Sequence, residues 1–143
     1  MACKGFSLLE LSLVLLIIGI VVSFSYPLYQ AHMIQVRRYD GQSALLDLAN
    51  RLERYYSEKN SYQSATMGTG KATDVLENNL SAGGWYMLSI ADQTPSFFTL
   101  QAIPIKSQVN DKCCQTLTFT SLGEKGISHG PRGMPGGTVK ECW

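Results

Sequence analysis

The first part of the chain carries one long apolar segment. Residues from Phe6 to Leu28 are almost all apolar, and no charged side chain occurs from Leu11 to Val36. As an α-helix, the segment Phe6 to Leu28 would span roughly 34 Å, slightly more than the hydrocarbon core of a bilayer. The pattern therefore predicts a helix that can cross a membrane.

A second pattern continues the helix in amphipathic form. Apolar side chains recur there at spacings of three and four, which places them on one helix face. We expect a nearly continuous helix from about Phe6 to about Glu58. Pro27 should kink it, and Gly19 should loosen it by about 1 kcal/mol relative to Ala. The apolar positions of the second half are Leu45, Leu48, Ala49, Leu52, Tyr55 and Tyr56.

Three strands are expected after a polar connecting loop. The loop, residues 62–84, is rich in Ser, Thr, Gly and Asn, and Thr73–Asn79 within it could form a short helix. The strands are Trp85–Ile90, Phe97–Ile103 and Gln115–Ser121. An antiparallel sheet with one apolar face needs a cover, which the amphipathic helix supplies, so we expect an α+β fold with a small sheet of three to four strands. In the last two strands apolar and polar positions alternate, and the shared apolar face consists of Phe98, Leu100, Ala102, Leu117 and Phe119.

Composition, charge and motifs argue against several classes of function. With 12 Lys and Arg against 11 Asp and Glu, the formal net charge is +1, which indicates no bulk attraction to nucleic acid. The sequence shows no nucleophile–base pair, no phosphate-binding glycine loop and no carboxylate pair in a plausible cleft. His32 and His129 stand alone, without the spacing of metal ligands. We expect no catalytic residue, no metal site and no cofactor, and therefore no enzyme.

Four cysteines are present, at Cys3, Cys113, Cys114 and Cys142. Three of them lie in the Gly- and Pro-rich last third, where an exported protein would use a disulfide to tether a loop. A bridge to Cys142 encloses about 28 residues and could stabilise the fold by roughly 3–4 kcal/mol. If strand alternation extends back, Cys113 faces inward and Cys114 faces the loop, which favours Cys114–Cys142. Pairing of Cys113 with Cys142 instead stays open. If Cys113 is left unpaired, it could be a buried small hydrophobe or form an intersubunit disulfide.

The N-terminal segment admits three interpretations. Lys4, the apolar core and Ser23-Phe24-Ser25 fit a secretory signal peptide, and the same segment fits an uncleaved membrane anchor. Neither explains Glu10, a carboxylate inside the apolar segment. The stretch GFSLLE, residues 5–10, resembles the class III signal of type IV pilins, in which Gly precedes Phe and Glu is the fifth residue counted from that Phe.

The resemblance implies a processing pathway and a filament. A prepilin peptidase would cut between Gly5 and Phe6, remove residues 1–5 as the leader, and methylate the new amine of Phe6. Glu10 of one subunit would then meet the N-terminal amine of its neighbour; alternatively, it snorkels to the lipid headgroups. Gly19 and Pro27 match places where pilin stems unwind. Residues 6–36 would form the transmembrane and filament-core helix.

Residues 37–143 would form the pilin head, with a disulfide-bounded C-terminal loop. The stretch from Cys114 to Thr118 and the terminal Cys-Trp resemble a subgroup of pilins, which also favours Cys114–Cys142. The partners implied are other pilins, the prepilin peptidase, the inner-membrane assembly machinery and the membrane before assembly. The localisation implied is the bacterial inner membrane and then the extracellular pilus.

The type IV pilus subunit, major or minor, has two rivals. A pseudopilin of a type II secretion system shares the stem, but the major pseudopilins carry an acidic calcium loop, and here no Asp follows Asp111. A DNA-binding pilin needs clustered cations. Between Cys114 and Cys142 three cations are offset by Glu124 and Glu141, which supports DNA only weakly. The three cations are Lys125, Arg132 and Lys140.

Overall fold

The structure is a computed structural model that describes residues 5–143. Cys3 and the rest of the expected leader before Gly5 lie outside the described residues. By its internal contacts the chain divides into two compact units, one up to Met33 and the other Ile34–Trp143. We call these units the stem and the head, and describe each by itself.

Helix α1, Leu8–Lys59, belongs to both units and contains Gly19 and Pro27 without interruption. This confirms the expected continuous helix to within two residues at each end. Beyond it, the backbone of Asn60 turns to a φ of +54°, a conformation that Asn adopts more readily than most residues. In the head, α1 buries one face, made of Gly41, Leu45, Leu48, Ala49 and Leu52.

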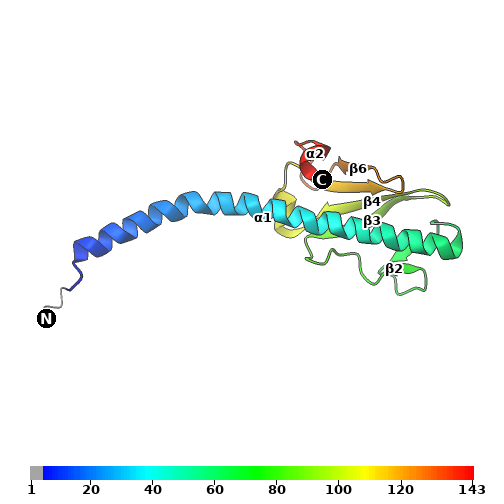
Figure 1. The fold of residues 1–143 in the computed structure, drawn as a ribbon, viewed down its shortest axis with the longest axis horizontal. Helices are drawn as coiled ribbons and strands as arrows, with labels where there is room; N and C mark the ends of the chain where they lie inside the picture. The colour runs from blue at the N-terminus through cyan, green and yellow to red at the C-terminus, as the bar shows by residue number, and fades with distance from the viewer. Residues whose placement is uncertain (1–4) are drawn as a thin grey trace. The chain divides into compact units, whose positions relative to one another are not determined.

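Four antiparallel strands form the sheet of the head, in the order β3-β4-β5-β6. They are β3 (Tyr86–Gln93), β4 (Phe98–Pro104), β5 (Thr116–Thr120) and β6 (Lys125–Ser128). Figure 1 shows the head part of α1 lying along this sheet. The first three strands confirm the expected ones, and β6 occupies a segment that the Gly and Pro content had assigned to loop.

The predicted alternation holds where β4 meets β5. Leu100 lies opposite Phe119 and Ala102 lies opposite Leu117, so the four apolar side chains share the face that packs on α1. Buried positions on both elements then form one core, as expected for an α+β fold. The fully buried core includes Leu45, Leu48, Leu52, Tyr86, Phe98, Leu100 and Leu117.

Strand β6 forms because a glycine permits close approach. Gly126 pairs with Thr118, and a Cβ on Gly126 would lie 2.5 Å from the hydroxyl oxygen of Thr118. The turn before the strand passes through Gly123, whose φ of +79° suits glycine. The glycines that predicted an irregular loop therefore serve a tight turn and a close strand pairing.

The connecting loop contains two short parallel strands, β1 (Thr66–Met67) and β2 (Asp74–Leu76). The short helix considered for Thr73–Asn79 was wrong. The Asp74 carboxylate accepts hydrogen bonds from the hydroxyls of Thr66 and Thr69, at 2.6 and 2.7 Å. Such side-chain bonds compete with helix formation.

Two short helices complete the head. The 3₁₀ helix η1, Lys106–Asn110, follows β4, and α2, Val139–Cys142, ends the chain. At the start of α2 the Glu141 carboxylate accepts a hydrogen bond from the Thr138 N–H at 2.7 Å, as the glutamate of a capping box does.

Candidate functional site

The residues of the GFSLLE stretch lie at the N-terminal end of α1. Gly5 and Phe6 precede the helix, and Glu10 lies in its first turn, where the helix dipole favours a negative charge. All three residues are exposed, and Glu10 forms no ion pair within residues 5–143. The side chain of Phe6 and the carboxylate of Glu10 are thus both open to a partner.

The stem presents apolar side chains on every side of the helix. Its large apolar side chains from Leu8 to Tyr29 are 41–86% exposed. The segment that is long and apolar enough to cross a membrane is buried nowhere in the described structure. Exposed apolar surface of this extent marks a membrane or protein contact, so the stem needs lipid or other stems around it.

Several polar side chains of the stem form hydrogen bonds within their own helix. The hydroxyls of Ser12, Ser23 and Ser25 donate to backbone carbonyls three or four residues earlier, at 2.7–2.9 Å. Gln30 donates to the Tyr26 hydroxyl one turn away, at 3.0 Å. Helices in apolar surroundings need internal hydrogen bonds of this kind, so these polar residues are compatible with burial in lipid or among stems.

Gly19 and Pro27 both lie inside α1. Nothing lies within 4 Å of the position that a Cβ on Gly19 would occupy, so no contact within the described chain requires glycine there. Proline removes one backbone donor from the helix. The unwinding that the pilin resemblance implies at these residues stays a prediction.

In the head, the disulfide joins Cys114 to Cys142, with Cα atoms 5.5 Å apart. It bounds the C-terminal loop, as expected. The reasoning from strand alternation, however, was wrong, because Cys114 is fully buried and Cys113 is only half-buried. Gln115, with a φ of +47°, interrupts the alternation before β5 begins, and the side chain before it turns into the core.

Cys113 lies beside that disulfide as a free thiol. The sulfur atoms of Cys113, Cys114 and Cys142 lie within 4.8 Å of one another. Two of the three are already joined, so the cluster is a disulfide with a thiol next to it. Gly137 packs against Cys113, since a Cβ on Gly137 would lie 2.4 Å from the Cys113 sulfur.

A buried ion pair joins α1 to the segment that precedes the disulfide. Arg38 donates from Nε and Nη2 to the two carboxylate oxygens of Asp111, at 2.6 and 2.8 Å, and the hydrogen bond raises the pKa of Arg38. The Asp111 side chain is 1% exposed. It also accepts from the backbone N–H groups of Cys113 and Cys114, at 3.2 and 3.3 Å. The pair therefore positions the first cysteine of the bridge.

The side chain of Gln108, which is fully buried, extends this network. Its amide nitrogen donates to the Tyr86 hydroxyl at 2.9 Å and to the Ile34 carbonyl at 3.1 Å. Burial raises the pKa of Tyr86, which keeps the phenol neutral. The ring of Tyr86 packs so closely on α1 that a Cβ on Gly41 would lie 2.9 Å from it.

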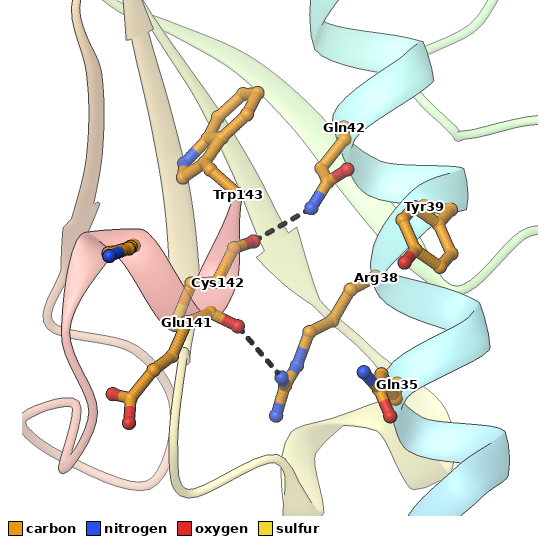
Figure 2. A pocket seen from close by; sticks show the side chains of 8 residues that line it. Gln35, Arg38, Tyr39, Gln42, Glu141, Cys142 and Trp143 are labelled. Atoms are coloured by element: carbon orange, nitrogen blue, oxygen red, sulfur yellow. Dashed lines mark hydrogen bonds between the residues drawn. The ribbon is translucent and has the colours of Figure 1, made fainter.

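A small pocket of about 210 Å³ lies between α1 and the C-terminal helix. Figure 2 shows Gln42 donating to the Cys142 carbonyl and Arg38 donating to the Glu141 carbonyl, at 2.7 and 3.4 Å. The pocket is smaller than typical sites for small molecules, and these contacts tether α2 to α1. Its lining consists of Gln35, Arg38, Tyr39, Gln42, Lys140, Glu141, Cys142 and Trp143.

Exposed cations are spread over residues 112–143, which we call the C-terminal segment of the head. They are offset by Glu124 and Glu141, of which Glu141 accepts hydrogen bonds from the N–H and hydroxyl of Thr138, and these bonds lower its pKa. The ammonium of Lys125 lies 5.1 Å from the Trp143 ring centroid. The C-terminal segment therefore carries a small excess of positive charge, with the aromatic ring of Trp143 close to one of its cations. Its exposed cations are Lys112, Lys125, Arg132 and Lys140.

Sequence reasoning missed the Arg38–Asp111 pair and a cluster of Arg37, Trp85 and Lys106. For Arg37 and Arg38 the sequence offered one indication of a special position, because they are the first charged residues after the apolar segment. Asp111 gave no signal, since its partner lies on a distant part of the chain. The cluster depends on β3 and η1 meeting α1, which no local pattern indicates.

Comparison with known proteins places the chain among the pilins. A family model described as type IV minor pilin ComP, DNA uptake sequence receptor, matches residues 27–118, and a prokaryotic N-terminal methylation motif matches residues 1–26. The non-core minor pilin PilV of Neisseria meningitidis is 25% identical with a TM-score of 0.52, over 74% of this chain and 97% of that structure. A type IV pilin from Shewanella oneidensis is 27% identical with a TM-score of 0.43, over 64% of this chain and 89% of that structure.

No curated protein sequence matches the chain. The ComP model nevertheless spans more than half of the residues and includes α1 from Pro27 onward, strands β1 to β4 and the first part of β5. The fold it covers, a long helix on an antiparallel sheet, is the fold of the PilV structure. The chain therefore belongs to the family of the type IV minor pilin ComP.

Proposed function

We propose that this chain is a minor subunit of a type IV pilus, stored in the inner membrane and then packed into the filament through its stem. The observation that carries the proposal is the stem's apolar surface, which is exposed on all sides while its serines are satisfied internally. Such a helix can exchange lipid for neighbouring stems while these hydroxyl groups keep their hydrogen bonds. The family match favours this function over a pseudopilin.

Processing would create the partner that Glu10 lacks. Cleavage between Gly5 and Phe6 leaves a positive amine on Phe6, and methylation keeps that charge. A carboxylate in apolar surroundings is costly unless paired, so contact between Glu10 and the amine of a neighbouring subunit would favour assembly. The methylation motif over residues 1–26 supports this step.

The N-terminal peptide of filaments sheared from the native cell surface tests the proposal. Mass spectrometry should find a peptide that begins at N-methylated Phe6. A start at Tyr26, as a signal peptidase would leave after Ser23-Phe24-Ser25, would refute it. So would an intact Met1 confined to the membrane fraction.

DNA is the second proposed partner, and the family description supports it, since that family is described as a DNA uptake sequence receptor. The exposed cations of the C-terminal segment would meet backbone phosphates; Asp111 is neutralised by Arg38, while Glu124 and Glu141 keep their negative charge and weaken the attraction. Four phosphate contacts would give a log–log salt slope of about −3.6, at −0.9 per contact.

Binding of a labelled duplex by the head over a range of salt concentrations tests the DNA partner. Replacing Lys125, Arg132 and Lys140 by Gln should make the log–log salt slope shallower by about 2.7, which is about 0.9 for each of the three lost contacts. Replacing Arg51 and Arg54 by Gln is the control, since these cations lie on α1 and outside the C-terminal segment. Equal slopes for the two variants would refute this assignment.

A further inference from the structure

Two cations share one indole ring in the head, and the proposed filament does not use them. The guanidinium carbon of Arg37 lies 3.7 Å from the centroid of the Trp85 ring, and the ammonium of Lys106 lies 5.6 Å from it. Arg37 also donates from Nη1 to the Ser107 hydroxyl at 2.8 Å. We call Arg37, Trp85 and Lys106 the indole cluster.

The cations of the indole cluster form no ion pair in the described chain, although the Asp40 carboxylate lies beside the Trp85 ring, where it accepts from the Ser81 hydroxyl and the Gly83 N–H. Neither Arg37 nor Lys106 forms an ion pair within residues 5–143, and Nε of Arg37 is buried without a hydrogen-bond partner. The neighbouring Arg38, by contrast, is fully paired with Asp111. Two like charges near one ring repel each other, so an anion between them is favoured by both.

The backbone holds the cluster in place. Lys106 adopts a φ of +52°, a conformation that residues other than Gly, Asn and Asp seldom adopt. The preceding Ile105 donates its N–H to the Trp85 carbonyl at 2.9 Å. The segment that enters η1 is thereby fixed to β3, which keeps Lys106 next to the ring.

The position of Arg37 in the chain indicates what the anion is. Arg37 is the first charged residue after the uncharged segment that starts at Leu11. At 1.5 Å per residue that helical segment spans about 39 Å, enough to cross the hydrocarbon core and reach the headgroup layer. Tryptophan is enriched at the interfaces on both sides of a membrane, and Lys and Arg near helix ends extend their charged groups to the same layer.

We propose that the indole cluster binds the phosphate of an anionic phospholipid headgroup and holds the subunit in the membrane before it enters a filament. The inference rests on the proposed function, because it requires the stem in a membrane. A DNA phosphate has similar chemistry, but the cluster directly follows the membrane-length segment, which favours lipid.

Fluorescence quenching in nanodiscs tests the inference on the full chain. Replacing Trp143 by Phe leaves Trp85 as the one tryptophan, since the chain has two. Nanodiscs would carry phosphatidylglycerol or phosphatidylcholine with a nitroxide near the top of the acyl chain, at equal mole fraction. We expect phosphatidylglycerol to quench Trp85 at least twice as strongly as phosphatidylcholine.

Charge variants separate a binding site from simple proximity. The variant R37Q/K106Q should bring the quenching ratio to about one, and R37K/K106R should keep it, because the charges remain. The control R54Q/K59Q removes the same charge from α1 away from the cluster and should also keep the ratio. A ratio that survives in R37Q/K106Q would overturn the inference.

The remaining outcomes also decide between explanations. Insertion of the stem with equal quenching by both lipids overturns the inference alone, whereas failure of the stem to enter nanodiscs overturns the proposed function with it. A short DNA duplex that changes Trp85 emission in nanodiscs without any lipid preference would assign the indole cluster to DNA and overturn the lipid site.

Discussion

Replacing Asp111 by Ala should destabilise the head by about 3–5 kcal/mol, the cost of breaking a buried ion pair by removing one partner. The Arg38 side chain is 15% exposed and the Asp111 side chain 1% exposed, so the guanidinium left behind has little access to water. The same substitution removes the acceptor of two backbone N–H groups, those of Cys113 and Cys114.

The size of this loss is large for a domain of this length. At 0.05–0.15 kcal/mol per residue, a head of about 110 residues has a free energy of unfolding of about 5–16 kcal/mol. Losing 3–5 kcal/mol would therefore remove about a fifth or more of that free energy. The segment between η1 and β5 should loosen first, because Asp111 holds it to α1 through Arg38.

Urea unfolding of the head fragment, followed by far-ultraviolet circular dichroism, measures the effect. The matched control is D47A, which breaks the exposed i,i+4 pair of Asp47 and Arg51 and should cost no more than about 0.5 kcal/mol. The double variant R38M/D111L should lose less than D111A, because no unpaired charge stays buried. A loss for D111A below about 1 kcal/mol, or equal to that of D47A, would refute the reasoning.

Two further predictions concern the disulfide and the connecting loop. In the head fragment, replacing Cys114 by Ser should leave no free thiol. The Cys113 sulfur lies within 4.8 Å of the Cys142 sulfur and can form the disulfide in place of Cys114. Thiol titration and peptide mapping measure this, and two free thiols would contradict it. Hydrogen bonds, of which the one from the Thr66 hydroxyl has the largest effect, lower the pKa of Asp74 from its usual 3.8 to about 2. The carboxylate therefore stabilises the loop above pH 3.8 and loses that effect as the pH falls toward 2, and an NMR titration midpoint near 3.8 would refute it.

Local periodicity determined most of the secondary structure. Spacings of three and four along residues 45–56 predicted the buried face of α1, and the alternation in β4 and β5 predicted the apolar face that the two strands share. These patterns succeed because side-chain direction repeats every 3.6 residues in a helix and every two in a strand. The GFSLLE stretch likewise carries its chemistry in consecutive residues, so the pilin resemblance needed no tertiary information.

Single backbone angles limited what the alternation could predict. The favoured disulfide partner was present in the structure, but for a different reason, since Gln115 adopts a φ of +47° and turns Cys114 into the core. Likewise, the glycines around β6 predicted a loop until Gly126 was found opposite Thr118. A two-residue period holds only while every residue stays extended, and the sequence does not state where that ends.

The sequence by itself determined the stem, the long helix and the apolar faces, because each is encoded by neighbouring residues, while the C-terminal bridge was expected mainly from the pilin resemblance. Only the tertiary structure paired Arg38 with Asp111 and brought Trp85 and Lys106 to Arg37. These contacts join residues about 50 to 70 positions apart, so they depend on how the helix, sheet and connecting segments pack. The contacts of a charged side chain that has no partner nearby in the sequence are therefore decided by the tertiary structure.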